Sequence, residues 1–224
     1  MAIDRDGRRS HYLATFDTGG SMRMLVRTDL YKPYRVAVAP DGSIWTAGVE
    51  ASDQAPAASK DPAADVLKPY LASGVIRHFD ASGRLLASFV PQNTVRHLFD
   101  LTHPRNYLVT GGGRVAWYSA EDRRYVEIDG DGRETDFTTQ LPASGAEVTG
   151  IAIVDNGTVF AAVNYGSGGS REHVICQLDR STRSWVPVRR EASYVLIYGA
   201  EGDVLVTATL VEDLRRITFL RAGQ

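Results

Sequence analysis

Two families of tight turn recur along the chain at a nearly constant spacing, and this repetition limits the fold more than any other feature. The first family is centred on Gly42, Gly112, Gly157 and Gly202. The last three follow one another at intervals of 45 residues, whereas 70 residues separate Gly42 from Gly112. Segments rich in Val, Ile and aromatic residues flank these turns, which predicts a β-hairpin around each.

The second family of turns follows an apolar residue and an aspartate. Its aspartates are Asp4, Asp80, Asp129 and Asp179. The two families alternate, so each unit of about 45 residues holds two hairpins and four strands, the content of one propeller blade. Repetition favours a structural role for the aspartates, because an Asp side chain accepts hydrogen bonds from the backbone two residues on. A calcium loop would also need acidic ligands further along, ending in Glu at its twelfth position.

The order of the turns predicts where the chain enters and leaves the repeat. We expect it to begin in the third strand of one blade, to run through three whole blades and to end with the third strand of a fifth, which makes 17 strands. A closed ring of four-stranded blades needs a multiple of four, so the count predicts an incomplete ring, part of a propeller of about six blades. Residues 1–224 are thus expected to form a single all-β propeller region of about four to five blades, with a surface insertion at 51–71 that is rich in Ala, Pro, Ser and Asp.

One hairpin carries a family resemblance. The segment Pro40-Asp41-Gly42-Ser43-Ile44-Trp45 resembles the inner hairpin of blades of the NHL-like and streptogramin-lyase-like kind, with looser copies at 154–160 and 199–205. The resemblance implies a β-propeller repeat protein and says little about activity, because propellers host many unrelated functions. The chain has 22 arginines but three lysines, a bias typical of a GC-rich bacterial genome.

The charge balance excludes some classes of partner. With 25 basic and 27 acidic side chains the formal net charge is −2, so the surplus of positive charge that nucleic-acid binding requires is missing.

No stretch approaches the roughly 18 apolar residues of a membrane span. The first residues, Met1-Ala2-Ile3-Asp4-Arg5, carry charge where a signal peptide would be apolar; an upstream start could still supply an export signal, so the compartment stays open. The single cysteine, Cys176, excludes an intrachain disulfide and is expected in the core.

Both long connections, 51–71 and 91–105, are expected on the same face of the propeller. Loops on a rigid scaffold often carry function, so we expect a binding site on this face, near the starts of first strands and the ends of second strands. The alternative for each residue there is a rim position that caps a strand end. The candidate ligand-binding residues are Tyr34, Arg35, Glu50, His97, His103, Arg105, Asn164 and Tyr194.

The sequence favours a non-catalytic scaffold that binds a protein segment or a small molecule and needs no cofactor. The alternative is a metal-dependent hydrolase, lactonase or lyase of the propeller superfamily. Lactonase-like propellers hold a divalent ion on oxygen ligands suited to calcium or magnesium. The resemblance implies that Glu50 and Asn164 could supply two of them, although the chain lacks the Glu-Gly-Pro-x-Trp and Asn-Gly-x-x-x-Ser-x-Asp segments of those enzymes. Streptogramin-lyase-like propellers use a His as general acid or base, for which His97 and His103 qualify by location alone. The histidines His78 and His173 fall in strands and are expected to pack or to occupy edges.

Overall fold

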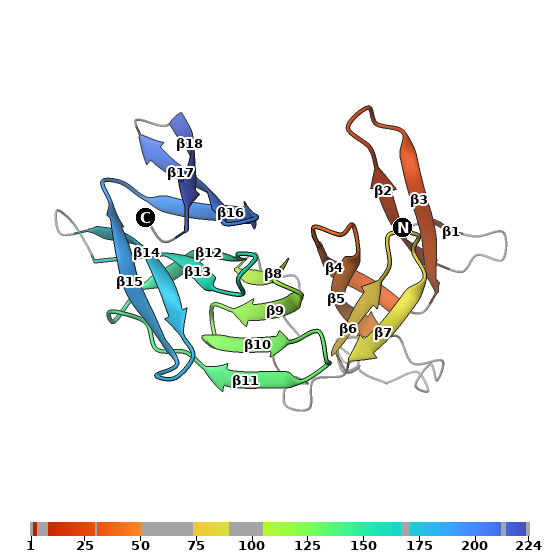
Figure 1. The fold of residues 1–224 in the computed structure, drawn as a ribbon, viewed down its shortest axis with the longest axis horizontal. Coiled ribbons are helices and arrows are strands. Elements are labelled where there is room, and N and C mark those ends of the chain that lie inside the picture. The colour runs from red at the N-terminus through yellow and green to blue at the C-terminus, as the bar shows by residue number, and fades with distance from the viewer. Residues whose placement is uncertain are drawn as a thin grey trace, which may run out of the picture. The chain divides into compact units, whose positions relative to one another are not determined.

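The computed structural model describes residues 2–3, 9–29, 31–50, 74–89, 105–166, 171–211 and 214–222. These residues form 18 strands in five antiparallel sheets and no helix, so they include no helix that could cross a membrane (Figure 1). The chain divides into two compact units, Met1–Thr102 (unit 1) and His103–Gln224 (unit 2). Within every sheet, neighbours in space are neighbours in sequence, which is the meander of a propeller blade.

Unit 1 holds a three-stranded and a four-stranded sheet. Their strands are β1 (Ala2–Ile3), β2 (Arg9–Phe16) and β3 (Met22–Asp29), then β4 (Tyr31–Val38), β5 (Ile44–Glu50), β6 (Gly74–Phe79) and β7 (Leu85–Phe89). Apolar side chains from both sheets form one core, made by Leu13, Met24, Ile44 and Phe79 with Val26 against them. Gly83 lies at their boundary with φ +88°, and a Cβ there would meet Cγ2 of Val26 at 2.1 Å. The sheets therefore pack as adjacent blades.

Unit 2 holds two four-stranded sheets and a three-stranded one. Their strands are β8 (Asn106–Gly111), β9 (Arg114–Ser119), β10 (Arg124–Ile128) and β11 (Glu134–Thr138); β12 (Glu147–Ile153), β13 (Val159–Tyr165), β14 (Glu172–Asp179) and β15 (Ser184–Glu191); and β16 (Val195–Glu201), β17 (Val204–Val211) and β18 (Leu214–Arg221). The first strands pack together, with β12 in contact with both β8 and β16. A Cβ at Gly150 would lie 2.1 Å from the carbonyl oxygen of Ile197, so glycine permits this close approach of two backbones.

The blade β12–β15 is covered on both faces. On one face Trp185 packs edge-on against Tyr118 of the preceding blade, in a cluster that also contains Cys176. On the other face Phe160 and Ile175 pack against Leu205 of the following blade. Burial raises the pKa of the Cys176 thiol to about 12, because the thiolate would lose its hydration. The prediction of a core cysteine is confirmed.

The prediction of an all-β propeller with four-stranded antiparallel blades is confirmed, and the two three-stranded sheets leave the set of blades incomplete. The prediction of a single propeller region with an insertion at 51–71 stays a prediction, and that insertion lies outside the described residues.

The described residues form 18 strands, one more than the 17 expected. The difference arises because residues 9–16, expected as the outermost strand of their blade, pair on both sides, with β1 and with β3. The hairpin of the second turn family in this blade is the one at Asp17. Its Oδ1 accepts hydrogen bonds from the backbone N–H groups of Gly19 and Ser21, at 3.0 and 2.8 Å. Oδ1 of Asp80 is bonded in the same way, two and four residues on, at 2.9 Å each. The role predicted for the turn aspartates is therefore confirmed at Asp80, Asp129 and Asp179, and Asp17 has it too, whereas Asp4 lies outside the described residues.

Candidate functional site

Six of the eight candidate residues lie among the described residues, and four of the six lie at strand ends as expected. In unit 1, Tyr34 and Arg35 lie in the middle of β4, and Glu50 ends β5. In unit 2, Arg105 precedes β8, Asn164 is the penultimate residue of β13 and Tyr194 precedes β16. The other two candidates, His97 and His103, lie outside the described residues.

Tyr34 and Arg35 have contacts with near neighbours in sequence. The Lys32 ammonium lies 4.7 Å from the centre of the Tyr34 ring, and Arg35 donates to the Tyr34 carbonyl at 3.4 Å. The third candidate of unit 1, Glu50, accepts a hydrogen bond from Arg77 at 3.0 Å. These contacts by themselves do not join the three candidates into one site.

In unit 2, Asn164 joins two neighbouring blades through its amide. Its Nδ2 donates to the carbonyl oxygen of Val195 at 3.0 Å and to Oγ1 of Thr149 at 2.7 Å. Its Oδ1 accepts from the backbone N–H of Val195 at 3.1 Å and lies 2.8 Å from Nδ1 of His173. The side chain is buried, so these bonds replace the water that the amide loses.

The two bonds to Val195 also fix the proton on His173. A backbone N–H can only donate and a backbone carbonyl can only accept, so the orientation of the Asn164 amide is determined, and Oδ1 must be the acceptor toward His173. Nδ1 of His173 is therefore the donor, and the neutral ring carries an unprotonated Nε2. Burial lowers the pKa of His173, and the positive charge of Arg171 lowers it further, so both causes favour this neutral form.

Tyr194 adjoins His173, and further aromatic and charged side chains interact with Tyr194. The ring of Tyr194 lies edge-on to the His173 ring, with centroids 6.0 Å apart. Arg105 forms an ion pair with Glu147 at 2.8 Å, which connects the start of β8 to the start of β12. Tyr107 donates to the carbonyl of Val148 at 3.3 Å. Burial raises the pKa of Tyr107 to about 12 and also raises that of Tyr194, so both phenols stay protonated donors.

These residues form one group, which we call the His173 cluster. Its members are Arg105, Tyr107, Glu147, Asn164, His173 and Tyr194. Three of them, Arg105, Asn164 and Tyr194, were expected from the sequence. Of the other three, Tyr107 joins the cluster through a contact between blades, which the repeat period does not reveal. Glu147 and His173 lie in the same blade as Asn164 and pair with it on either side, so strand register was the one signal that could have found them.

The His173 cluster does not fit a divalent metal ion. Oδ1 of Asn164 already accepts two hydrogen bonds, and the carboxylate of Glu147 is ion-paired with Arg105. Within the described ranges no group of three or more His, Cys, Asp or Glu residues could hold a metal ion. The chemistry that the cluster offers is donation by two phenols and a guanidinium, and acceptance by His173 Nε2.

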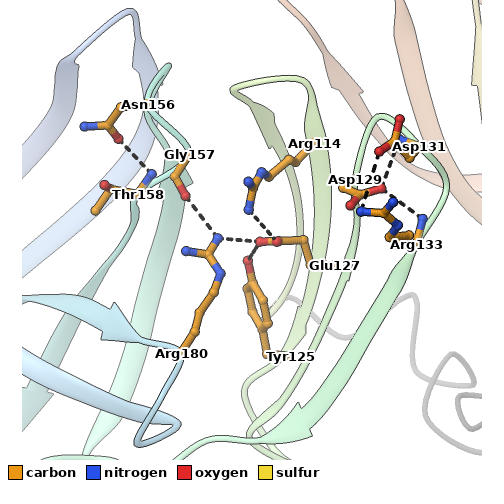
Figure 2. A network of polar contacts seen from close by, with 10 residues as sticks. All are labelled: Arg114, Tyr125, Glu127, Asp129, Asp131, Arg133, Asn156, Gly157, Thr158 and Arg180. Carbon is orange, nitrogen blue, oxygen red and sulfur yellow. Dashed lines mark hydrogen bonds and ion pairs between the residues drawn. The ribbon is translucent and has the colours of Figure 1, made fainter.

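A second polar network in unit 2 involves the first-family turn around Gly157 and the second-family turn after β14 (Figure 2). The buried carboxylate of Glu127 accepts from Arg114 at 2.9 Å, from Arg180 at 2.6 Å and from the hydroxyl of Tyr125. Arg180 also donates to the carbonyl of Gly157 at 3.0 Å. These partners belong to two neighbouring blades, β8–β11 and β12–β15, so the network serves as a clamp between them.

No family model and no curated protein matches the chain. Among solved structures it is similar to the hydrazine synthase of Kuenenia stuttgartiensis, at 14% identity and TM-score 0.47 over 99% of this chain and 70% of the other. It is similar to a luciferin-regenerating enzyme at 13% and 0.47, over 96% and 71%, and to a streptogramin B lyase at 13% and 0.37, over 86% and 69%. At such low identities the activities of those proteins cannot be assigned to this chain.

Proposed function

We propose that this protein is a non-catalytic binding scaffold and that the His173 cluster is its ligand site. One observation supports this most: side chains from three neighbouring blades meet at the same ends of their inner strands. A rigid sheet framework places them, and such a framework suits recognition because little order has to be created on binding.

The composition of the cluster points to the chemistry of the ligand. The side chains of Arg105 and Glu147 are 54% and 34% exposed, so a ligand can reach both. Tyrosine and arginine combine a planar contact surface with directional donors, and both are enriched among residues that dominate binding energy. A planar group beside Tyr194 with an acceptor toward Arg105 would use these properties. Either a protein segment or a small molecule can present such a group.

The remaining parts of the proposal follow from the sequence. We propose that the blades are of the NHL-like or streptogramin-lyase-like kind and of bacterial origin, on the evidence of the Pro40-Asp41-Gly42 hairpin and the arginine bias. A net charge of −2 supports a partner that is not a nucleic acid. A cofactor-free site is proposed over a calcium or magnesium site.

A hydrolase or lyase is the second candidate function, and one observation favours it. Nε2 of a neutral His173 is an acceptor whose ring is oriented by Asn164, which is the arrangement of a general base held by an amide. Without a nucleophile or an electrophilic partner in the cluster, this observation supports proton acceptance in binding as well as it supports catalysis.

The test uses the full chain and a set of small aromatic carboxylates screened by ligand-observed NMR. We expect hits whose binding weakens about tenfold or more in Tyr194→Ala, since an aromatic anchor carries that much of a small ligand's affinity. Asp129→Asn, in an exposed turn, serves as the control and should leave binding unchanged. Ligands whose binding is weakened by Asp129→Asn but not by substitutions at Tyr194 and His173 would show that the site lies elsewhere.

A further inference from the structure

The sheet β16–β18 has a free outer edge in the part of the chain that the structure describes. Its last strand, β18, pairs with β17 on one side and has no partner strand on the other. In the neighbouring blade the same edge is occupied, because β15 pairs with β14 from Asp179 to His173. The eight residues of β18 therefore present unpaired backbone donors and acceptors, to which an extended peptide can add as a further strand.

A pocket of about 270 Å³ lies beside this edge, between the blade β12–β15 and the sheet β16–β18. Its apolar lining comes from Phe160, Ile175 and Val188 on one side and from Leu205 and Leu220 on the other. No member of the His173 cluster lines it. Pockets for small organic ligands start at about 300 Å³, so the size suits one large side chain better than a whole ligand.

The neighbouring blade shows which kind of side chain fills such a place. In β15, Trp185 lies opposite Leu178 of β14, and it is 2% exposed within the core shared with the preceding blade. Leu220 has the position in β18 that Leu178 has in β14, because each is the penultimate residue of an eight-residue third strand and packs toward the preceding blade. A side chain opposite Leu220 in an added fourth strand would therefore enter the pocket.

The strand β18 carries positive charge that no acidic residue balances. Its sequence includes Arg215, Arg216 and Arg221 and no Asp or Glu, and none of these arginines forms an ion pair with a residue that the structure describes. In the blade β8–β11, by contrast, the third-strand residue Arg124 is ion-paired with Asp136 of the fourth strand. Opposite charges on facing strands stabilise their pairing, so the edge favours an acidic partner.

The face of β18 that points away from the pocket is apolar and exposed. Ile217 and Phe219 lie at alternate positions of the strand, on the face opposite to Leu220, and are 58% and 70% exposed. Covering them would remove apolar surface from water, which is favourable in proportion to the area covered. An added strand therefore needs apolar side chains on this face and an aromatic one toward the pocket.

We propose that the edge of β18 binds an extended, acidic segment of a partner protein, antiparallel, as the fourth strand of this blade. A large aromatic side chain of the segment lies opposite Leu220 and fills the pocket. One and three residues further on, apolar side chains lie opposite Phe219 and Ile217. Four and five residues after the aromatic one, acidic side chains lie opposite Arg216 and Arg215. Backbone pairing supplies affinity, while the pocket and the arginines select the sequence.

The experiment titrates the full chain into a fluorescently labelled peptide of this pattern, Ser-Trp-Val-Thr-Val-Glu-Glu-Glu, and follows its anisotropy. We expect binding to weaken at least about tenfold when Trp is replaced by Ala, since one aromatic anchor has an effect of that size. Replacing the first two Glu by Arg should cause a similar loss, because like charges then face each other. N-methylation of the backbone amides that face β18 should abolish binding, because it removes the donors. Absence of binding by the first peptide, or equal binding by its N-methylated form, would overturn the proposal.

Two protein variants locate the site. Val188→Asp puts a charge at the pocket rim, and Arg216→Glu reverses the charge opposite the first glutamate, so each should weaken binding about tenfold. The peptide with two arginines should bind Arg216→Glu more tightly than the wild type. Val36→Asp is the matched control and should bind as the wild type does, because Val36 lies in unit 1 and is 52% exposed, against 51% for Val188. Unchanged binding in both Val188→Asp and Arg216→Glu, or a dimer of the chain in sedimentation that excludes the peptide, would refute the assignment.

Discussion

Two clamps join neighbouring blades of unit 2, and they use opposite chemistry. Between the blades β8–β11 and β12–β15, the buried carboxylate of Glu127 is shared by two arginines and a tyrosine. Between the blades β12–β15 and β16–β18, the neutral amide of Asn164 is bonded to both backbone groups of Val195. The first clamp depends on balanced charges, and the second on the exact complementarity of one amide with one peptide unit.

The two clamps should differ in the substitutions that they tolerate. A buried ion pair contributes little relative to an apolar replacement, but the loss of one partner leaves an uncompensated charge. The loss of a neutral amide leaves only an unpaired donor or acceptor, which destabilises the fold less than an uncompensated charge does. The charged clamp uses Arg114 and Arg180 to neutralise Glu127, whereas the neutral clamp orients His173 beside the half-buried ring of Tyr194. Stability is thus expected to depend most on Glu127, and recognition on Asn164.

The largest expected effect is at Glu127. Glu127→Gln leaves Arg114 and Arg180 facing each other without an anion, so we expect the free energy of unfolding to fall by about 3 kcal/mol. Urea unfolding followed by tryptophan fluorescence measures it. Glu172→Gln removes one partner of an exposed pair and should change the same quantity by less than about 1 kcal/mol. Equal losses in the two variants would remove the distinction between the clamp and a surface pair.

At the neutral clamp we expect a loss of about 2 kcal/mol for Asn164→Ala, because the buried N–H of Val195 then has no acceptor. The matched control is Asn156→Ala. Its Oδ1 also accepts a backbone N–H, that of Thr158 at 2.8 Å, but in an exposed turn where water can replace it. A larger loss at Asn156 than at Asn164 would contradict the burial argument. The same unfolding measurement serves both variants.

A smaller effect is expected from the titration of His173. Because burial lowers its pKa in the folded state, its contribution to stability is present above pH 6.5 and is lost as the pH falls through the folded value. His173→Gln should therefore flatten part of the decrease between pH 7 and pH 5. Nitrogen NMR should show a protonated Nδ1 and an unprotonated Nε2 at neutral pH; the opposite tautomer would mean that the amide of Asn164 is reversed.

The smallest effect concerns the exposed turn aspartates, which extend the comparison to carboxylates in water. The pKa of Asp80 is lowered to about 2, first by the hydroxyl of Ser82 and then by the backbone N–H of Arg84. Its stabilising effect is thus present above pH 3.8 and is lost as the pH falls through about 2. Carboxyl carbon NMR should give a midpoint near 2 for Asp80, and Ser82→Ala should move it toward 3.8. An unchanged midpoint in Ser82→Ala would show that the hydroxyl has no part in the shift.

The turn chemistry made most of the fold predictable, and its one failure has a physical reason. The pattern at Asp4 ends in arginine, as at Asp80 and Asp129, whereas the pattern at Asp17 ends in Ser21. Oδ1 of Asp17 accepts from the backbone N–H of Ser21, and this bond needs no particular side chain at that position. A pattern defined by the aspartate and by the glycine that adopts positive φ, such as Gly20 or Gly83, would have found it.

The candidate site was predictable only in outline. Strand ends could be placed from the hairpin period, which is why Arg105, Asn164 and Tyr194 were found. The role of Asn164 could not be predicted, because its main partner, Val195, lies 31 residues away in the next blade. Contacts between blades depend on how the sheets pack, and the repeat period carries no information about that packing.

The buried thiol of Cys176 gives the molecule a built-in reporter of motion. It is the sole cysteine of the chain, and only its thiolate reacts with alkylating or disulfide reagents at a useful rate. With its pKa raised to about 12, the folded protein should be almost inert to such reagents. Modification would then require the blade β12–β15 to separate transiently from the blade β8–β11. The labelling rate of the unaltered protein therefore measures how often this part of the core opens.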